Sequence, residues 1–393
     1  MEYILRRIQR AGVFGWLYAL SLFHGFHFFS VHYINSSLLE QYISQSDVGL
    51  LIGISSGLTV LTLSAATLFL SIFGAYRTAL AATAINLVSS LGLAVVGDVG
   101  LVFVLFAIHT IMIPLTLFCF DVFMENNMQD ESTTGSTRGV YLSMALLAAL
   151  VAPALSGLVT GDENAYERSY FMGALFLIPV LYMLAIRFRH FTDPVYEIFS
   201  PKRVWVALQN NNNLFHVSMA QFLMRLFFSW NVVYLPIYLN QTIGFSWPEI
   251  GLILFLMLIP YILIEYPAGV IADKFLGEKE LLATGFVITA LATVALYLLD
   301  TPNLFLWATV LFVTRMGTAL IESMSETYFF KQIDGDDTSI LSIFRMLRPL
   351  GYMIGPILAG GLLLTMEISM LWIILAGIMC LGVFHAYALE DTK

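Results

Sequence analysis

The chain has 393 residues, of which 59% are hydrophobic and only 11% are charged. Its apolar residues lie in runs of about twenty, the length at which a helix crosses roughly 30 Å of hydrocarbon. This composition excludes a water-soluble globular protein. The net charge of −9 says little about partners, because in a membrane protein only the position of charges relative to the bilayer is informative, and no nucleic-acid partner is expected. Both cysteines, Cys119 and Cys380, lie in apolar runs, so neither a disulfide framework nor a metal site is expected, and no cofactor is implied.

The apolar runs predict an all-α polytopic membrane protein with twelve transmembrane helices. The first run follows MEYILRRIQR without a small-residue cleavage signature, which favours a retained helix over a signal peptide. The connections between spans two and three and between spans eight and nine are short enough to require antiparallel hairpins. The predicted spans are residues 11–34, 47–70, 73–95, 100–124, 139–159, 169–187, 214–239, 248–271, 280–299, 304–327, 341–364 and 367–388.

The distribution of Lys and Arg predicts the orientation of the spans. On this map 15 of the 18 basic residues fall on one side, Arg168 alone lies on the other, and Arg225 and Arg315 lie inside spans. Because basic residues accumulate on the cytoplasmic side, both termini are predicted to be cytoplasmic in a multi-pass protein of the plasma membrane. Nothing in the sequence indicates an oligomer, and a monomer is expected.

The longest predicted cytoplasmic connection, residues 188–213, divides the chain into an N-terminal six-helix bundle (1–187) and a C-terminal six-helix bundle (214–393). Pro194 and Pro201 interrupt this linker, and an Asn run precedes span seven.

An internal repeat supports two pseudo-symmetric bundles. DVGL at 47–50 matches EIGL at 249–252 at an offset of 202 residues. Near the ends of spans four and ten, Asp121 and Glu125 match Glu322 and Glu326 at an offset of 201. Pro153 and Gly157 match Pro356 and Gly360 at an offset of 203. Three anchors at nearly the same offset indicate a duplicated unit, and since six is even, both copies have the same orientation.

A charged hairpin follows span eight, with the sequence GVIADKFLGEK at 269–279. It resembles the G-x-L-A-D-R-x-G-R-R signature of the major facilitator superfamily, and the six-plus-six layout extends the resemblance over the chain. Two departures are one extra residue before Gly277 and Glu278 at a position that is usually basic. The equivalent loop of the first half, SIFGAYR at 71–77, lacks the aspartate.

The resemblance implies that this hairpin is a gating latch, which holds the cytoplasmic ends of the two halves together when the central site faces outward. Its predicted residues are Gly269, Asp273, Lys274 and Gly277, with the start of span five around Arg138 as the partner. A carboxylate at a helix end can pair with a cation or with exposed amides of a second helix. The alternative is a solvated turn that carries positive-inside charges.

Two arginines lie near the middle of their spans, where a charged side chain requires a partner or a wet cavity. Arg225 lies about eleven residues into span seven and Arg315 about eleven into span ten, and spans one, four, seven and ten would line the central cavity of this fold. Arg315, Glu322 and Glu326 share one face of span ten. Three alternatives are open: the arginines neutralise Glu265 and Glu322 in a structural network, at least one binds an anionic group of the substrate, or they pack against lipid and snorkel, which is difficult at midplane depth. Asn231 on span seven completes the candidate binding residues of this half.

Histidines mark the first half, with His24 and His27 on span one and His109 on span four. They are candidate substrate-binding residues, and His24, together with Glu265, Glu322 and Glu326, is a candidate for proton coupling because such groups can change charge. Two alternatives stay open, namely neutral histidines that bridge helices and a zinc site. The zinc site lacks a convincing set of further ligands.

Other classes of protein find less support. GISSG at 53–57 matches the nucleophile pattern of hydrolases but lies within a predicted span instead of a strand-to-helix turn, and no Walker or H-E-x-x-H sequence occurs. An enzyme is therefore not expected. The sequence predicts a secondary transporter of a small organic solute, working by alternating access in the lipid bilayer, with protons, sodium or passive diffusion as the possible drive.

Two alternatives to this transporter are retained. One is a non-transporting scaffold or receptor of the same fold, and the other is a drug exporter for hydrophobic compounds. In the superfamily a Gly-Pro-rich segment on the fifth helix is associated with exporters, whereas here the better copy, with Gly351, Gly355 and Pro356, lies on span eleven.

Overall fold

The structure is a computed structural model that describes residues 2–128, 131–196, 201–274, 276–332 and 338–390. Within these ranges the side chains of residues 2–11, 131–136, 201, 203–205, 265, 266, 273, 338–343 and 345 are not described. The described secondary structure is entirely helical. The longer helices are α1 (Glu2–His32), α3 (Gln45–Ser64), α5 (Ala75–Leu93), α6 (Val99–Asn127), α7 (Glu131–Thr160), α8 (Tyr166–Arg187), α10 (Asn212–Ile237), α11 (Trp247–Lys274), α12 (Glu278–Leu298), α13 (Leu304–Lys331), α14 (Thr338–Leu363) and α15 (Met370–Tyr387). The shorter ones are α2 (Asn35–Glu40), α4 (Ala66–Phe73), α9 (Pro201–Asn210) and the π-helix η1 (Tyr238–Ile243).

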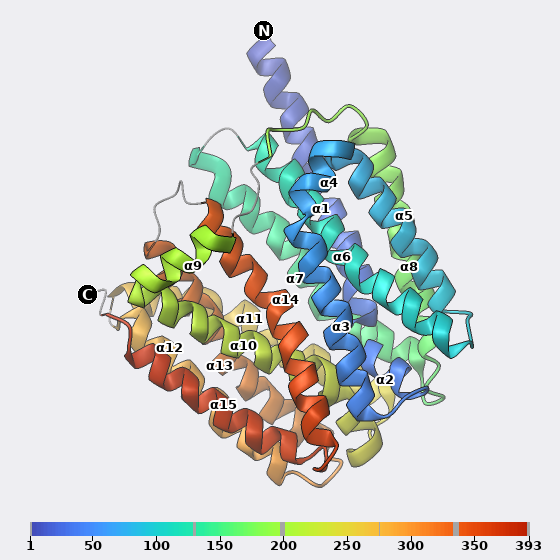
Figure 1. Cartoon of the computed structure of the whole chain (residues 1–393), viewed down its shortest axis with the longest axis vertical. Helices are drawn as coiled ribbons and strands as arrows, with labels where there is room; N and C mark the ends of the chain where they lie inside the picture. Colours follow the sequence, from blue (N-terminus) through green and yellow to red (C-terminus); the bar gives the residue numbers. More distant parts are fainter. Residues whose placement is uncertain (1, 129–130, 197–200, 275, 333–337, 391–393) are drawn as a thin grey trace. The chain divides into compact units, whose positions relative to one another are not determined.

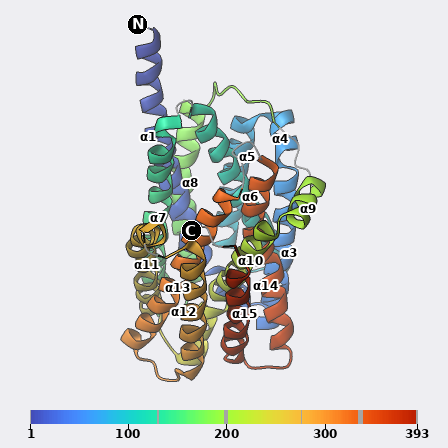
Figure 2. The same ribbon diagram turned by 90° about the vertical axis from the view of Figure 1, so that its left-hand side faces the viewer.

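Each of the twelve predicted spans corresponds to one of the twelve longer helices. Among the described residues, ten helices are long and apolar enough to cross a membrane, and an eleventh span results if α4 and α5 are counted together. The twelfth, α1, has 31 residues but carries three histidines in its second half, which lower its hydropathy. Its first turns project beyond the neighbouring helices of its own unit (Figures 1 and 2).

The turn between spans two and three lies at Gly74. The axes of α4 and α5 differ in direction by 112° across this residue. Gly74 has a φ of 81°, which an L side chain rarely adopts, so glycine allows the sharp turn. The predicted tight connection is thus made at one residue with a positive φ.

The helix contacts divide the chain into two compact units. Unit 1 comprises Met1–Asn35 and Leu58–Ile198, and unit 2 comprises Ser36–Gly57 and Phe199–Lys393. In unit 1, α1 packs against α7 and α8, and α5 packs against α6 and α8. In unit 2, α12 packs against α13 and α15, α11 against α13, and α10 against α14 (Figure 2).

The N-terminal part of α3 belongs to unit 2 because glycines let it approach α14 closely. A Cβ at Gly49 would overlap the carbonyl oxygen of Pro356, and a Cβ at Gly53 would overlap the Ile357 side chain. The Tyr234 hydroxyl of α10 donates a hydrogen bond to the same carbonyl at 3.1 Å. Small residues at such contacts let backbones of transmembrane helices pack against each other. The predicted division at the linker 188–213 assigns all of span two to the N-terminal bundle. The helix contacts instead group residues 36–57, which include the first part of α3, with unit 2.

Short polar residues fix where several of these helices begin. The side chains of Asp98, Asn211 and Asn303 accept hydrogen bonds from the backbone N–H groups of Leu101, Leu214 and Leu306, at 2.9, 3.0 and 3.1 Å. Each is an N-cap that satisfies a backbone donor otherwise left free at a helix start. The caps set the register of α6, α10 and α13, which carry the polar residues of the candidate site.

Candidate functional site

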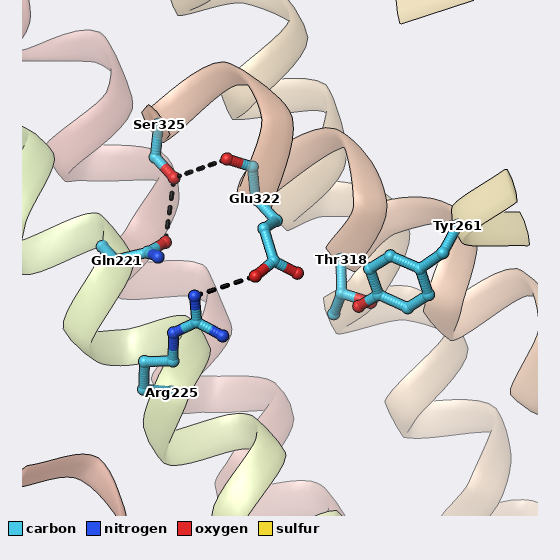
Figure 3. A network of polar contacts seen from close by, with 6 residues as sticks. All are labelled: Gln221, Arg225, Tyr261, Thr318, Glu322 and Ser325. Atoms are coloured by element: carbon cyan, nitrogen blue, oxygen red, sulfur yellow. Dashed lines mark hydrogen bonds and ion pairs between the residues drawn. The ribbon is translucent and has the colours of Figure 1, made fainter. Parts of the chain in front are cut away.

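An ion pair joins α10 to α13 in the interior of unit 2. The Arg225 guanidinium donates to the Glu322 carboxylate at 2.8 Å, and the two side chains are only 14% and 28% exposed. Figure 3 shows the two side chains reaching toward each other from their helices. Glu326, one turn further along α13, is close enough to interact electrostatically with Arg225.

A glycine of α14 makes room for this arginine. A Cβ at Gly351 would lie 2.7 Å from the Cβ of Arg225, which real Cβ atoms essentially never do. Gly351, in the Gly-rich sequence of span eleven, therefore lets α14 pack directly against Arg225, the partner of Glu322.

Neutral polar groups surround the ion pair. The Ser325 hydroxyl lies 2.9 Å from the Gln221 amide oxygen and 3.2 Å from the Glu322 backbone carbonyl (Figure 3). The hydroxyl groups of Tyr261 and Thr318 lie 2.9 Å apart, beside Glu322. The amide nitrogen of Gln221 is buried and has no hydrogen-bond partner among the described residues. The cluster thus contains an available donor next to its ionic groups.

Arg315 lies in the same unit and is completely buried. Its guanidinium carbon lies 5.6 Å from the ring centre of Phe227 and 5.0 Å from that of Phe228. None of its three nitrogens has a hydrogen-bond acceptor among the described residues. A cation–π contact contributes about 0.5–2 kcal/mol, whereas an uncompensated buried ion costs several kcal/mol, so the rings do not offset the loss of hydration. Arg315 is a cation that requires an anion or water.

Asn231 provides a second available polar atom on α10. It is fully buried, and its amide nitrogen donates to the Phe227 carbonyl at 3.0 Å. Its amide oxygen has no partner in the described part of the chain. Asn231, Gln221 and Arg315 are thus three of the buried polar side chains of unit 2 that have atoms without a partner among the described residues.

Unit 1 contains a chain of hydrogen bonds through two histidines. His27 of α1 contacts the Gly173 carbonyl of α8 through Nδ1 at 3.0 Å and the Asn86 amide nitrogen of α5 through Nε2 at 2.9 Å. The Asn86 amide oxygen lies 2.8 Å from Nδ1 of His109 on α6, and the Ser90 hydroxyl lies 3.2 Å from the same nitrogen. These fully buried groups join four helices of one unit.

His24 lies one turn from His27, and its ring centre is 6.1 Å from that of His27. It is 1% exposed, packs edge-on against Phe120 and has no hydrogen-bond partner for either ring nitrogen among the described residues. The described residues contain no group of three or more His, Cys, Asp or Glu side chains that could hold a metal ion. Both nitrogens of His27 are already engaged, so the histidines do not converge on one ion.

The predicted latch is described only in part. The side chains of Asp273 and Glu265 lie outside the described residues. Lys274 and Arg138 are exposed, and Gly277 is the N-cap residue of α12. The latch therefore stays a prediction, as does any role of Glu265.

The roles of two carboxylates near the predicted cytoplasmic hairpins were not predicted from the sequence. Glu278, which departs from the family signature, is 2% exposed and forms an ion pair with Lys331, joining the start of α12 to the end of α13. Asp193 accepts a hydrogen bond from the Ala75 backbone N–H at 2.7 Å, although 118 residues separate the two. The hydroxyl of Tyr196 also donates to Asp193. Burial and this hydrogen bond raise the pKa of the Tyr196 hydroxyl.

Asp193 thus supplies a carboxylate to the loop at 71–77, whose own sequence lacks the aspartate of the signature. The residues lie on different segments, so no local motif could have revealed the contact. A pocket of about 640 Å³ adjoins it, lined in part by Arg77 and Arg189 and by none of the buried histidines.

The comparisons with known proteins agree with this architecture. A family model described as Major Facilitator Superfamily matches residues 217–393. A crystal structure of a single-residue mutant of the nucleoside transporter NupG is 14% identical, with a TM-score of 0.75, and the alignment covers 95% of this chain and 99% of that one. A POT family transporter in complex with a thioalcohol-conjugated peptide is 10% identical, with a TM-score of 0.79 and 94% of each chain covered.

A bacterial homologue of the human lysosomal transporter Spinster, in an inward-facing and unoccupied conformation, is 10% identical with a TM-score of 0.72. That alignment covers 97% of this chain and 95% of the other. At these identities the solved structures establish a shared fold and no shared substrate. A comparison with curated proteins gave no match.

Proposed function

We propose that the chain belongs to the major facilitator superfamily, whose family model matches residues 217–393, and that it is a secondary transporter that moves a small organic anion across the membrane by alternating access. It is a multi-pass membrane protein with many apolar helices. In this fold, substrate sites lie near the bilayer midplane and motion of two halves exposes them to each side in turn. The proposal concerns a carrier without enzymatic activity.

Arg315 carries the anionic part of this proposal. Its guanidinium is buried and permanently charged, and no described residue accepts its hydrogen bonds. A carboxylate or phosphate can form two parallel hydrogen bonds with such a group. Arg225 is a weaker candidate because Glu322 already neutralises it. Gln221 and Asn231 are further candidate contacts, as each has a buried atom without a partner in the described residues.

The retained alternatives differ in what they require of this site. A scaffold or receptor of the same fold would need no available buried cation, and an exporter of hydrophobic compounds would be served better by the aromatic residues alone. The stack of Phe227 and Phe228 on Arg315 suits an organic anion that has an apolar portion.

We also propose proton coupling, a plasma-membrane location, cytoplasmic termini and a monomeric state. Proton coupling is supported by titratable side chains in the interior of both units, including His24, His109 and Glu322. The positions of Lys and Arg along the sequence support the orientation. Reporter fusions at the C-terminus would test it.

A thermal-shift screen of the purified protein tests the substrate class. Carboxylates, phosphates and sulfonates should raise the melting temperature, whereas neutral and cationic compounds of similar size should not. A ligand that binds only the folded state stabilises it by about 2.7 kcal/mol at a hundred times its Kd.

Arg315→Lys is the matched variant, since lysine keeps the charge but loses the planar fork. We expect it to weaken binding of the anion identified in the screen by tenfold or more, about 1.4 kcal/mol, with little change in the melting temperature without ligand. Arg168→Lys is the control because Arg168 lies in an exposed ion pair with Glu163. A large loss of stability without ligand, with affinity intact, would show that Arg315 is structural and would favour a neutral or cationic solute.

A further inference from the structure

The hydrogen bonds around His27 and His109 have a fixed direction, and this direction begins at a backbone carbonyl. The Gly173 oxygen can only accept, so the His27 Nδ1 atom, 3.0 Å away, must carry a proton. In a neutral imidazole the other nitrogen is then an acceptor. The Asn86 amide nitrogen, 2.9 Å from His27 Nε2, is the donor that fits it.

The same reasoning assigns the tautomer of His109. With the amide nitrogen of Asn86 directed at His27, its oxygen faces Nδ1 of His109 at 2.8 Å. That oxygen can only accept, so Nδ1 of His109 is protonated as well. The Ser90 hydroxyl, 3.2 Å from the same nitrogen, accepts a longer second bond. In the neutral ring, Nε2 of His109 is consequently left with a lone pair.

This Nε2 atom is buried and has no hydrogen-bond partner among the described residues. A proton added to it leaves every other hydrogen bond in the chain as it is, since Nδ1 continues to donate to Asn86. A proton added to His27 would instead require Asn86 to turn over and His109 to change its tautomer. The two histidines are therefore chemically distinct, although both are fully buried.

The described titratable neighbours of His109 are two histidines and a tyrosine. His27 and His24 face it from α1, with ring centres of His27 and His109 at 5.4 Å. From α8, the Tyr170 ring lies 5.8 Å away and its hydroxyl donates to Asn35 at 2.6 Å. On α5 the neighbours Asn86 and Ser90 do not titrate. His24 has two unpartnered nitrogens but lacks a hydrogen bond that fixes its ring.

We propose that Nε2 of His109 is the proton-binding atom of unit 1, and that Asn86 and His27 hold its ring in the accepting tautomer. The proposal rests on the proposed transport function and deepens its proton coupling. The step transfers one proton from a hydronium ion to the Nε2 lone pair, forming an N–H bond and releasing water. Burial opposes a charged imidazolium, so uptake accompanies a conformation in which water reaches the ring.

Nitrogen NMR of the full chain in nanodiscs, labelled with 15N-histidine, tests the proposal without a substrate. The chain has seven histidines, and the ring shifts distinguish protonated from unprotonated nitrogens. His109→Asn assigns the signal and conserves a side-chain N–H in place of Nδ1, while His190→Asn, at an exposed position, is the control. At pH 7.5 we expect His27 and His109 as Nδ1–H tautomers. On acidification His109 should become an imidazolium while His27 stays neutral.

Three results would overturn the proposal: His109 as the Nε2–H tautomer, protonation of His24 or His27 first, or a neutral His109 at pH 4.5 in folded protein. All are read from the spectra of the wild-type protein, and the variants serve only to assign its signals. His109→Gln replaces His109→Asn if that variant fails to fold, and single substitutions of His24 and His27 assign their signals in the same way. Failure here would leave anion binding at Arg315 intact, and failure of the anion screen would leave the tautomers measurable. The two proposals are therefore tested separately.

Discussion

The ion pair between Arg225 and Glu322 neutralises two charged side chains in the interior of unit 2. The pair is mostly buried, and Gly351 of α14 packs directly against Arg225. Separating the two charges therefore costs free energy, because neither is fully hydrated. Removing one member of a buried pair costs about 3–5 kcal/mol, because the remaining charge is uncompensated. Partial exposure reduces this cost.

We therefore expect Arg225→Met to lower the free energy of unfolding by about 1–3 kcal/mol, less than for a fully buried pair because both side chains are partly exposed. The double variant with Glu322→Gln should recover most of the loss, because no stranded carboxylate remains. Thermal unfolding of the four proteins of this cycle measures the coupling. Equal losses in the single and double variants would mean that Arg225 stabilises by packing, not through Glu322.

At the scale of helices, α12 and α13 approach each other closely through two facing glycines. A Cβ at Gly285 would lie 2.8 Å from the Gly317 carbonyl oxygen, and a Cβ at Gly317 would lie 2.7 Å from the Gly285 carbonyl. Each glycine thus faces the backbone of the other helix, which cannot move aside like a flexible side chain. The register of α13, and with it Arg315 and Glu322, depends on this contact.

Gly317→Ala should destabilise the protein by about 1–3 kcal/mol, as expected for overpacking. Gly377→Ala is the control, since a Cβ at that position of α15 meets nothing within 4 Å. Melting temperatures measure the difference. If both variants melt alike, the helices separate without cost and the contact does not fix α13.

The start of α5 depends on a residue that is distant in sequence. Asp193→Ala removes the acceptor of the Ala75 backbone N–H, and loss of such a cap costs about 0.5–2 kcal/mol. Asp193→Asn keeps an acceptor and should cost less. Hydrogen exchange in the first turn of α5 should rise most in the alanine variant, with Asp162→Ala, at an exposed turn of unit 1, as the control. Unchanged exchange would show that α5 is fixed by packing alone.

For the whole molecule, proton coupling predicts how transport responds to a gradient. An imposed pH gradient should drive accumulation in proteoliposomes of the anion that stabilises the protein most, and a protonophore should abolish it. Histidine and carboxylate side chains inside the units are the physical basis of this expectation. Accumulation that ignores both treatments would favour sodium coupling or passive diffusion.

Whole-chain patterns were readable in the sequence because they depend on composition and length alone. Twenty-residue apolar runs must become helices in a bilayer, where backbone groups find no other partners. The helical class and the twelve spans followed from this rule. The hairpin at 269–279, with Gly269 and Gly277, also pointed to the superfamily whose family model matches residues 217–393.

The partners of individual polar side chains were decided only by tertiary structure. The sequence placed Arg225 and Arg315 at similar depths in their spans and left the same roles open for both. In the structure Arg225 forms an ion pair with Glu322, whereas Arg315 packs against two phenylalanine rings. Likewise, spacing along the chain did not distinguish the surroundings of His24, His27 and His109. The structure does, because Gly173 and Asn86, from other helices, form hydrogen bonds with His27. Helical periodicity tells which face a residue occupies, but the atom opposite depends on how helices distant in sequence rotate and pack.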